Sequence, residues 1–196
     1  MKHKMLSEGI HAWHAGSKIS AEDCKSIIDL GKQTEFKKAA VHSLKGNADY
    51  ESDIRQGTLN FNNQQWVYDL LWPYMLTANK NSNWNFDISS AESYQIGKYE
   101  VGDYYKTHID SLGTHSTKWI AEDSPHLHNK VRKISMSLTL NDDFEGGDII
   151  IFGVGKIKQE TGSMIFFPSF LPHEVTPVTK GTRYSLVAWF LGTPWQ

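Results

Sequence analysis

The second half of the chain is a series of short, β-rich runs, and this pattern constrains the fold more than any other feature of the sequence. From residue 92 onward, segments rich in Ile, Val, Tyr, Phe and Thr are separated by Gly, Pro, Asn and Asp. These segments cover residues 92–100, 104–110, 133–142, 147–153, 163–169, 173–178 and 183–192. About seven or eight strands at such short intervals predict an antiparallel sandwich or a small barrel.

The first half of the chain has the signals of helices. Ser20 followed by Asp23 resembles a capping box in which Asp replaces Glu, and the apolar residues behind it predict a helix through about residue 33. A second helix is predicted over residues 62–76, where Pro73 should kink or end it. Helices that come before a run of strands predict a helical layer that covers one face of an antiparallel sheet.

Two polar stretches, residues 36–60 and 111–130, predict long loops or a loosely ordered hairpin. Loops of this length in a compact domain are often functional. No repeat or linker divides the chain, so we expect one domain over residues 1–196. In it, residues 1–91 would form a helical support with substrate-side loops, and residues 92–192 a catalytic β core.

Composition limits the class of protein. The chain has 196 residues, enough for one domain with a large core, and its net charge of −2 leaves no basic excess for binding a nucleic acid. The single cysteine, Cys24, excludes an intramolecular disulfide and fits a reducing cytoplasm. Because no apolar run is long enough for a signal peptide or a membrane span, we expect a soluble cytoplasmic protein without a membrane partner. Its oligomeric state is left open.

A candidate metal site begins with His108 and Asp110. On a strand these two side chains share a face, so they could chelate one cation. The pair alone is usually a chance match, a buried histidine beside a solvated aspartate. His173, after a later hydrophobic run, supplies a second imidazole, and two His with one carboxylate form the facial triad of non-haem Fe(II) oxygenases. The absence of thiolate ligands argues against structural zinc.

Arg183 adds a second candidate function to the same region. It begins an apolar predicted strand, where burying a guanidinium is costly without an anionic partner. A dicarboxylic keto acid could chelate iron with one end and pair with Arg183 at the other, with the Ser185 hydroxyl on the same face. The alternative is that Arg183 forms a surface salt bridge.

These features together resemble the 2-oxoglutarate- and Fe(II)-dependent dioxygenases, and among them the prolyl 4-hydroxylase-like branch with its PKHD-type hydroxylases. The likeness rests on "YEVGDYYKTHID" (99–110), "LNDDFEGGDIIIF" (140–152) and "GSMIFFPSFLPHEVTPVTKGTRYSLVAWF" (162–190). It covers about residues 92–192. The earlier part matches only in its helical layer and in "DIRQGTLNF" (53–61), which resembles a strand near the substrate entrance. The resemblance implies a mainly β fold with flanking helices: a double-stranded β-helix (a jelly-roll, cupin-like barrel) with an N-terminal helical layer.

The resemblance also implies roles for single residues. His108, Asp110 and His173 would ligate Fe(II), and Arg183 would pair with the distal carboxylate of 2-oxoglutarate. The other residues implied near the cosubstrate are Tyr99, Thr139, Ser185 and Trp189. Arg55 and Tyr105 are candidate substrate contacts, with a surface charge and a core aromatic as the respective alternatives.

Departures from the pattern narrow the resemblance. Some collagen-type relatives have lysine where this chain has Arg183, and Thr139 replaces a tyrosine of oxygen-sensing relatives. Base-repair relatives have further Asn and Arg residues after this arginine, where the chain has Ser185 and Trp189, which argues against nucleobase demethylation. Halogenating relatives lack the carboxylate ligand, and Asp110 is present.

The expected activity is therefore that of a hydroxylase that couples C–H hydroxylation to decarboxylation of 2-oxoglutarate, with O2 as the second cosubstrate and ascorbate as a candidate reductant. By resemblance the substrate is a prolyl residue of a peptide or protein. The alternatives are hydroxylation of a free amino acid or other small molecule, a non-redox cupin-like metal-binding module, and a barrel lectin.

Overall fold

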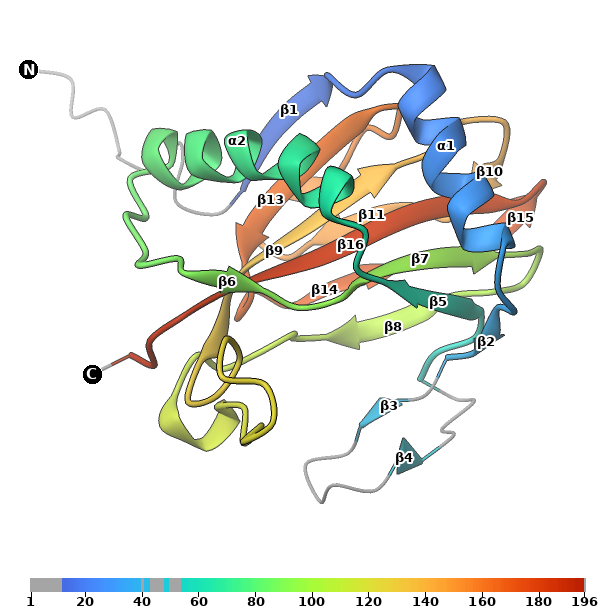
Figure 1. Cartoon of the computed structure of the whole chain (residues 1–196). Coiled ribbons are helices and arrows are strands. Elements are labelled where there is room, and N and C mark those ends of the chain that lie inside the picture. The colour runs from blue at the N-terminus through green and yellow to red at the C-terminus, as the bar shows by residue number, and fades with distance from the viewer. Residues whose placement is uncertain (1–11, 40, 43–47, 50–53, 196) are drawn as a thin grey trace, which may run out of the picture.

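The computed structural model describes residues 12–39, 41–42, 48–49 and 54–195 of the chain. Within these residues the protein has two facing β-sheets, and two α-helices lie on the outer face of the larger sheet (Figure 1). The larger sheet has eight described strands in the order β1-β13-β9-β16-β7-β5-β2, with β6 beside β16. Their bounds are β1 Trp13–Ser17, β2 Lys37–Lys38, β5 Thr58–Asn62, β6 Ser90–Ala91, β7 Tyr94–Tyr99, β9 Val131–Thr139, β13 Ser163–Pro168 and β16 Arg183–Gly192.

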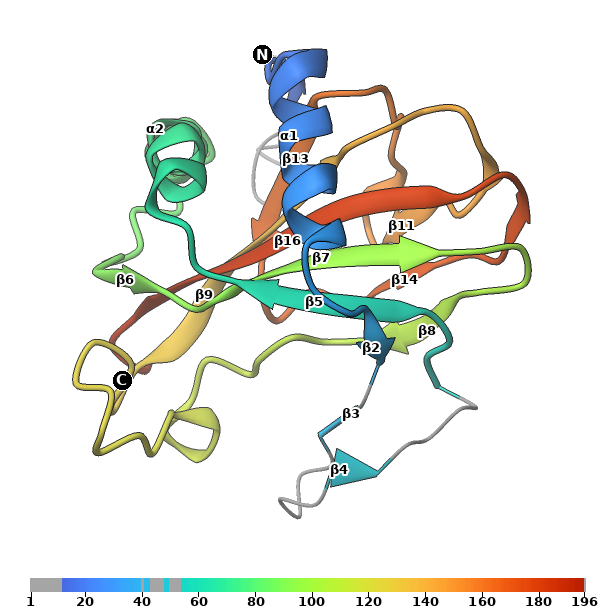
Figure 2. The same ribbon diagram turned by 45° about the vertical axis from the view of Figure 1, so that its right-hand side comes forward.

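The smaller sheet has four described strands in the order β12-β11-β14-β8 and lies on the side away from the helices (Figure 2). Its strands are β8 (Tyr105–His108), β11 (Ile149–Ile151), β12 (Gly155–Lys156) and β14 (His173–Val175). Two short pairs complete the described strands: β3 (Val41–His42) with β4 (Ala48–Asp49), and β10 (Glu145–Gly146) with β15 (Val178–Lys180). The predicted mainly β fold with flanking helices is confirmed.

Successive side chains of the central strands point to opposite faces of the larger sheet. One face is a hydrophobic core, and the other is polar and faces the smaller sheet. On β16, Leu186, Ala188 and Phe190 are buried in the main core against the helices, whereas the intervening residues face the smaller sheet. Strand β9 follows the same rule, with Ile134, Met136 and Leu138 in that core. The other face of β9 has the hydroxyl side chains of residues 135, 137 and 139. The space between the sheets is therefore bordered by small polar groups.

A second hydrophobic cluster holds the two sheets together. Ile149 and Ile151 of the smaller sheet pack with Ile165 and Phe167 of β13, in the larger sheet, and with Ile157. Because apolar contacts close this end of the sandwich, the polar inner face borders the remaining space.

Helix α1 (Ala21–Lys32) confirms the predicted capping signal. The Ser20 hydroxyl accepts a hydrogen bond from the Asp23 backbone N–H at 3.0 Å and donates one to the Asp23 carboxylate at 2.6 Å. The buried Cys24 and Ile27 face the sheet. The cap fixes where the helix begins, and its apolar face fixes how it packs.

Helix α2 (Gln65–Asn81) was predicted to be kinked or ended by Pro73, and the second alternative is wrong because the helix continues to residue 81. Pro73 is exposed, and so is Asp69, whose carbonyl lacks a backbone partner four residues later. Water can satisfy a carbonyl on the solvent face. The stripe of Val67, Leu71 and Met75 remains buried across the proline, so tertiary packing maintains the helix.

The prediction of long loops or a loosely ordered hairpin has a different outcome in each polar stretch. Residues 111–130 contain one 3-10 turn, η1 (His115–Thr117), and otherwise form turns and loops. In residues 36–60 the described parts include β2, the antiparallel pair β3–β4, a segment at residues 54–57 that bridges to Tyr105, and the start of β5, so short strand pairs replace the predicted loop there. Residues 40, 43–47 and 50–53 lie outside the described part of the chain.

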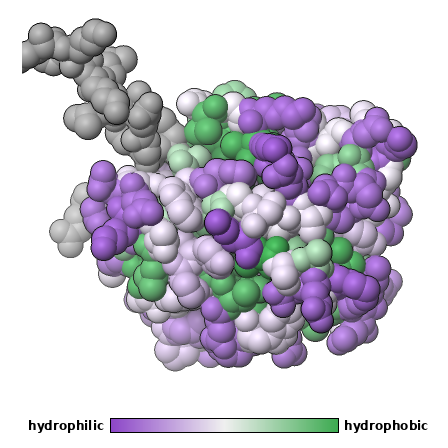
Figure 3. Space-filling view, turned by 90° about the horizontal axis from the view of Figure 1, so that it is seen from above, coloured by the Kyte–Doolittle hydropathy of each residue, from purple (hydrophilic) through white to green (hydrophobic). Residues whose placement is uncertain are grey.

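The helical side of the molecule has a mixed surface. Figure 3 shows hydrophilic residues spread over this face, with hydrophobic ones in small, separate groups. Among the described residues, neither helix has the length and apolar character needed to cross a membrane.

Side chains alternate between two faces along β16, and this predicts where replacing a large side chain by alanine destabilises the protein. Phe190 is fully buried and contacts the rings of Trp72 and Phe166. Phe190→Ala should therefore lower the free energy of unfolding by about 3–5 kcal/mol. The matched control is Phe152→Ala, at a side chain that is 49% exposed, which should cost less than about 1 kcal/mol. Equal losses in urea denaturation would contradict this account of the core.

Candidate active site

Pairing of β8 with β14 brings two histidines together. The register places His173 directly opposite His108, and the ring centroids lie 4.2 Å apart. Because the two residues are directly opposed in an antiparallel pair, their side chains project from the same face of the smaller sheet. Both border the space between the sheets.

Asp110 completes the cluster just beyond the end of β8. Its Oδ1 lies 3.7 Å from His108 Nε2 and its Oδ2 lies 3.5 Å from His173 Nε2. The three side chains each offer one ligand atom, and all these atoms lie within 4.8 Å of one another. The sequence prediction that these residues meet is therefore confirmed, while their role as ligands remains a prediction.

Neighbouring groups hold the Asp110 carboxylate in place. The Ser135 hydroxyl donates to Asp110 Oδ2 at 2.6 Å and accepts from the Ser169 hydroxyl at 2.9 Å. The Ser169 carbonyl accepts from the backbone N–H groups of Asp110 and Ser111, at 3.0 and 3.1 Å. Sequence reasoning missed both serines, although Ser135 has the same strand parity as the predicted Thr139.

Both imidazoles have the same tautomer. His108 Nδ1 lies 2.9 Å from the Lys106 carbonyl, and His173 Nδ1 lies 2.9 Å from the Leu171 carbonyl. A carbonyl oxygen can only accept, so each Nδ1 must carry the proton. Each Nε2 is then unprotonated and lies beside the Asp110 carboxylate, and a carbonyl on the other ring nitrogen is the arrangement that orients metal-ligating histidines.

Electrostatics leaves His108 and Asp110 ready to bind a cation. Burial lowers the pKa of His108 from 6.5 to about 4, and the neighbouring His173 adds to this effect. Burial alone would raise the pKa of Asp110, but the adjacent histidines, Arg132 and the Ser135 hydroxyl lower it to about 2. At neutral pH the pair is a neutral imidazole and an ionised carboxylate, the forms that metals require.

Arg183 is buried with neutral partners. Its side chain is 1% exposed; Nε donates to Gln159 Oε1 at 3.0 Å, and Nη1 donates to the Ser185 hydroxyl at 2.9 Å. In the described part of the chain no carboxylate forms a salt bridge with it, which rules out the surface-salt-bridge alternative. Burial lowers its pKa to about 10, so the guanidinium stays charged at neutral pH. Because a buried cation without an acidic partner is unfavourable, the Arg183 guanidinium favours the binding of an anion.

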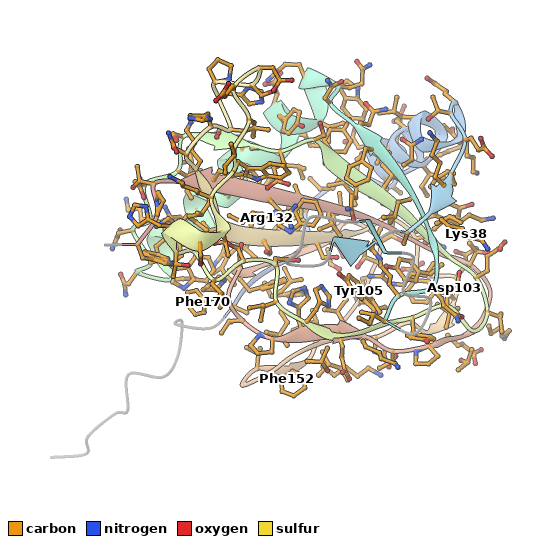
Figure 4. The ribbon with its side chains drawn as sticks, turned by 90° about the horizontal axis from the view of Figure 1, so that it is seen from below. Lys38, Asp103, Tyr105, Arg132, Phe152 and Phe170 are labelled. Atoms are coloured by element: carbon orange, nitrogen blue, oxygen red, sulfur yellow. The ribbon has the colours of Figure 1, made fainter. Side chains whose placement is uncertain are left out.

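One cavity of about 1340 Å³ connects these groups. It is lined by the three metal-site side chains and by Arg183, and also by the predicted residues Arg55, Tyr99, Tyr105, Ser185 and Trp189. Thr139 lies opposite Ser185 in the register but not among the lining residues. In Figure 4, seen from below, Arg132 and Tyr105 lie near the middle of the view, whereas Lys38 and Phe152 lie nearer its outline.

The two candidate substrate contacts lie close to the metal-site residues. Tyr105 stacks on His108 with ring centroids 3.5 Å apart, and the Arg55 guanidinium carbon lies 4.4 Å from the Tyr105 ring centroid. Arg55 is only 8% exposed, so its interpretation as a surface charge is wrong. Contact of either residue with a substrate remains a prediction.

A further charged group in the cavity had not been singled out in the sequence. Arg132 makes a bidentate pair with Glu92, with nitrogen–oxygen distances of 2.6 and 2.5 Å. Its guanidinium carbon lies 3.9 Å from the centroid of the Trp189 ring. The partners come from distant segments, so local patterns gave no signal for this arrangement.

Comparison with known proteins identifies the family. The model of the 2OG-Fe(II) oxygenase superfamily matches residues 94–191, which contain the triad and Arg183. The chain therefore belongs to the 2OG-Fe(II) oxygenase superfamily. Among its relatives are PKHD-type hydroxylases of Alteromonas mediterranea, 33% identical over 97 residues, and of Gloeothece citriformis, 36% identical over 100 residues. These matches cover 48% and 50% of this chain but only 41% of each relative, so the similarity spans less than half of their length.

Solved structures extend the likeness to most of the chain. A viral collagen prolyl hydroxylase of Paramecium bursaria Chlorella virus-1 superposes with a TM-score of 0.68 at 18% identity, covering 96% of this chain and 99% of that protein. A Pseudomonas putida prolyl-4-hydroxylase gives 0.63 at 18% identity, with 92% of each chain covered. At this identity the match establishes the fold, and it confirms the predicted double-stranded β-helix.

The donor set fits the metal that the family uses. Two imidazole nitrogens and one carboxylate oxygen suit Fe(II), and a cavity on the other side of these atoms leaves room for further ligands. The family and the triad together imply Fe(II) and 2-oxoglutarate.

The depressed pKa of His108 predicts a pH-dependent loss of stability in the metal-free protein. In the folded state His108 stays neutral down to about pH 4, whereas the unfolded chain binds a proton near pH 6.5. The unfolded state therefore binds more protons in this window, and stability falls as the pH drops from 6.5 toward 4, by on the order of 2–3 kcal/mol.

Urea denaturation with chelator at several pH values measures this loss. His108→Gln should flatten the dependence on pH, whereas His14→Gln, at an exposed histidine, should leave it unchanged. Parallel pH profiles for the His108→Gln variant and the wild type would contradict the assignment.

Proposed function

We propose that the protein is an Fe(II)- and 2-oxoglutarate-dependent hydroxylase that acts on a prolyl residue of a peptide or protein. The observation that carries this proposal is the placement of His108, Asp110 and His173 in one cavity with a buried Arg183 that has only neutral partners. The triad offers a metal site, and the guanidinium offers a separate anion site. A dicarboxylic keto acid matches both chemistries.

Different residues would bind the metal ion and the cosubstrate. His108, Asp110 and His173 would hold Fe(II), and the Arg183 guanidinium would hold the distal carboxylate of 2-oxoglutarate in a bidentate pair. The Ser185 and Tyr99 hydroxyls line the cavity near this guanidinium and could donate to the same cosubstrate. Thr139 is proposed at the edge of this pocket on the basis of its register with Ser185.

When bound, the metal supplies the oxidising chemistry with O2: 2-oxoglutarate is converted to succinate and CO2, and one oxygen atom becomes the substrate hydroxyl. The protein contributes orientation and exclusion of water. Phe167 packs edge to face against His173, with ring centroids 4.7 Å apart, and Tyr105 covers His108. These rings fix the imidazoles and keep one side of the site dry.

The size of the cavity supports a peptide substrate. Its volume of about 1340 Å³ exceeds the ~300–1,000 Å³ of pockets that enclose small molecules. It extends from the triad to residues 59–61 of β5 and to residues 116–120 of the long loop. The Trp189 ring, with the Arg132 guanidinium over it, forms a rigid part of the cavity wall against which a substrate could pack. Relatives in the solved structures include a prolyl hydroxylase of Trichoplax adhaerens bound to a peptide fragment of hypoxia-inducible factor.

The cosubstrate site predicts a spectroscopic signature. Anaerobic addition of Fe(II) and 2-oxoglutarate to the metal-free protein should produce a visible metal-to-ligand charge-transfer band that needs both additions. His173→Ala should abolish the band. Arg183→Met should raise the Kd of 2-oxoglutarate by at least about 30-fold, since removing one partner of a desolvated charge pair typically costs about 2–5 kcal/mol. Metal binding without such a band would favour a non-redox binding module.

The substrate class predicts a selective product. Proline-containing peptides incubated aerobically with protein, Fe(II) and 2-oxoglutarate should gain one oxygen atom on a prolyl residue, as detected by tandem mass spectrometry. Asp110→Ala is the matched inactive control. Hydroxylation of free amino acids in preference to every peptide would contradict the peptide assignment and leave the oxygenase assignment intact.

A further inference from the structure

Arg55 reaches the site from a short segment that bridges the two sheets. Residues 54–56 run beside β8: Gln56 N–H donates to the Tyr104 carbonyl at 2.9 Å, and Lys106 N–H donates to the Ile54 carbonyl at 2.8 Å. Arg55 forms an antiparallel bridge with Tyr105. The chain then passes directly into β5 of the larger sheet. The Arg55 backbone therefore belongs to one sheet, while its side chain can reach the other.

The Arg55 side chain ends on neutral groups of β7. Its Nε and Nη2 atoms donate to the Tyr99 hydroxyl oxygen at 3.1 and 3.0 Å, and Nη2 also lies 3.3 Å from Gln95 Oε1. The described residues place no carboxylate in a salt bridge with Arg55. It is thus a second buried guanidinium in the cavity, with two of its donors aimed at one phenol oxygen.

These two hydrogen bonds dictate which way Tyr99 can donate. A phenol oxygen accepts through its lone pairs and has one O–H to donate. With two guanidinium donors on the oxygen, the hydroxyl proton must point away from Arg55. Among the described residues no acceptor for this proton is recorded, and Tyr99 lines the cavity. The hydroxyl is therefore set up as a donor toward whatever anion occupies the cavity.

Two glycines fix the Tyr99 ring in this orientation. A Cβ atom on Gly57 would lie 3.2 Å from one edge of the ring, and a Cβ atom on Gly97 would lie 3.1 Å from the other edge. Gly57 also has φ of +135°, which other residues rarely adopt. The ring therefore lies in a slot that any side chain at these positions would narrow, and the hydroxyl has little freedom to move away from Arg55.

We infer that Arg55 is a positioning residue for the cosubstrate, acting through Tyr99. By donating twice to the Tyr99 oxygen, Arg55 turns the Tyr99 O–H toward a carboxylate of 2-oxoglutarate and polarises it as a donor. This inference rests on the proposed function. It assigns Arg55 to the cosubstrate and gives a reason for its burial without an acidic partner. Pre-organised donors of this kind cost no reorganisation when the anion binds.

Two other accounts of Arg55 make different predictions. Its charge could attract the cosubstrate directly, since it is close enough to lower the pKa of Arg183. Alternatively, it could only fasten the two sheets together. A double-mutant cycle on the Kd of 2-oxoglutarate separates all three, with the anaerobic charge-transfer band of the Fe(II)-loaded protein as the readout.

The cycle compares wild type, Arg55→Met, Tyr99→Phe and the double variant. Loss of one charge-assisted hydrogen bond should raise the Kd about tenfold in Tyr99→Phe, and Arg55→Met should raise it about three- to tenfold. If Arg55 acts through Tyr99, the double variant should match Tyr99→Phe within about twofold. Lys18→Met removes the same charge from an exposed side chain that does not line the cavity, and it should leave the Kd unchanged.

Several results would overturn the inference. Multiplicative effects in the double variant would show that Arg55 acts on the cosubstrate independently of Tyr99. An Arg55→Met protein with reduced thermal stability and an unchanged Kd would show a purely structural role.

Where Arg55→Met fails to fold, Arg55→Lys is the substitute. It keeps the charge but not the paired donors, so a wild-type Kd in that variant would contradict the mechanism. A wild-type protein without any 2-oxoglutarate-dependent band would overturn the proposed function, and this inference with it.

Discussion

The register between β8 and β14 is the constraint on which the candidate active site depends. His108 and His173 are far apart in the chain, yet they become directly opposed residues on one face of the smaller sheet. A slip of one residue would turn one imidazole to the opposite face, because side chains alternate along a strand. The register is secured on its other side, where β11 pairs with β14 through three consecutive residues and buries Ile149 and Ile151. The hydrophobic contact between the sheets therefore holds β14 in place, and the β8–β14 register brings His108 beside His173.

Three arginines line the same cavity, and they differ in whether an acidic partner balances the charge. Arg132 has its own carboxylate in Glu92, so it is a fixed part of the cavity wall. Arg183 and Arg55 have only neutral partners in the described residues. Burying a guanidinium without an anion is unfavourable, and the binding of a dicarboxylate would relieve this cost. The proposed cosubstrate is thus also a stabilising ligand, which links the fold to the occupancy of its site.

Local patterns in the sequence predicted the strands, the α1 cap and the His108–Asp110 pair, because each depends on spacing within one segment. His173 and Arg183 come from other segments and were recognised by their residue types and by the family resemblance. Chemistry that depends on contacts between segments was not predictable in the same way. Ser135 and Ser169 support Asp110 only because β9 and the loop before β14 meet behind it, and Gln159 reaches Arg183 from a separate loop. Arg55 read as a surface charge because the short polar segment around it gives no sign that it pairs with β8. The alternative that Pro73 ends the second helix is wrong for the opposite reason, since tertiary packing overrode a local signal.

The central claim is that the His108, Asp110 and His173 side chains hold the metal ion. The Arg183 guanidinium then pairs with the distal carboxylate of the 2-oxoglutarate that this metal binds. The most direct test is a crystal structure grown anaerobically with 2-oxoglutarate and Mn(II), a redox-inert substitute for Fe(II) whose anomalous scattering locates the metal. The account predicts a single strong anomalous peak bonded to the three side chains, with the distal carboxylate of 2-oxoglutarate paired with Arg183. A metal bound at other residues, or a keto acid whose distal carboxylate lies away from Arg183, would contradict it.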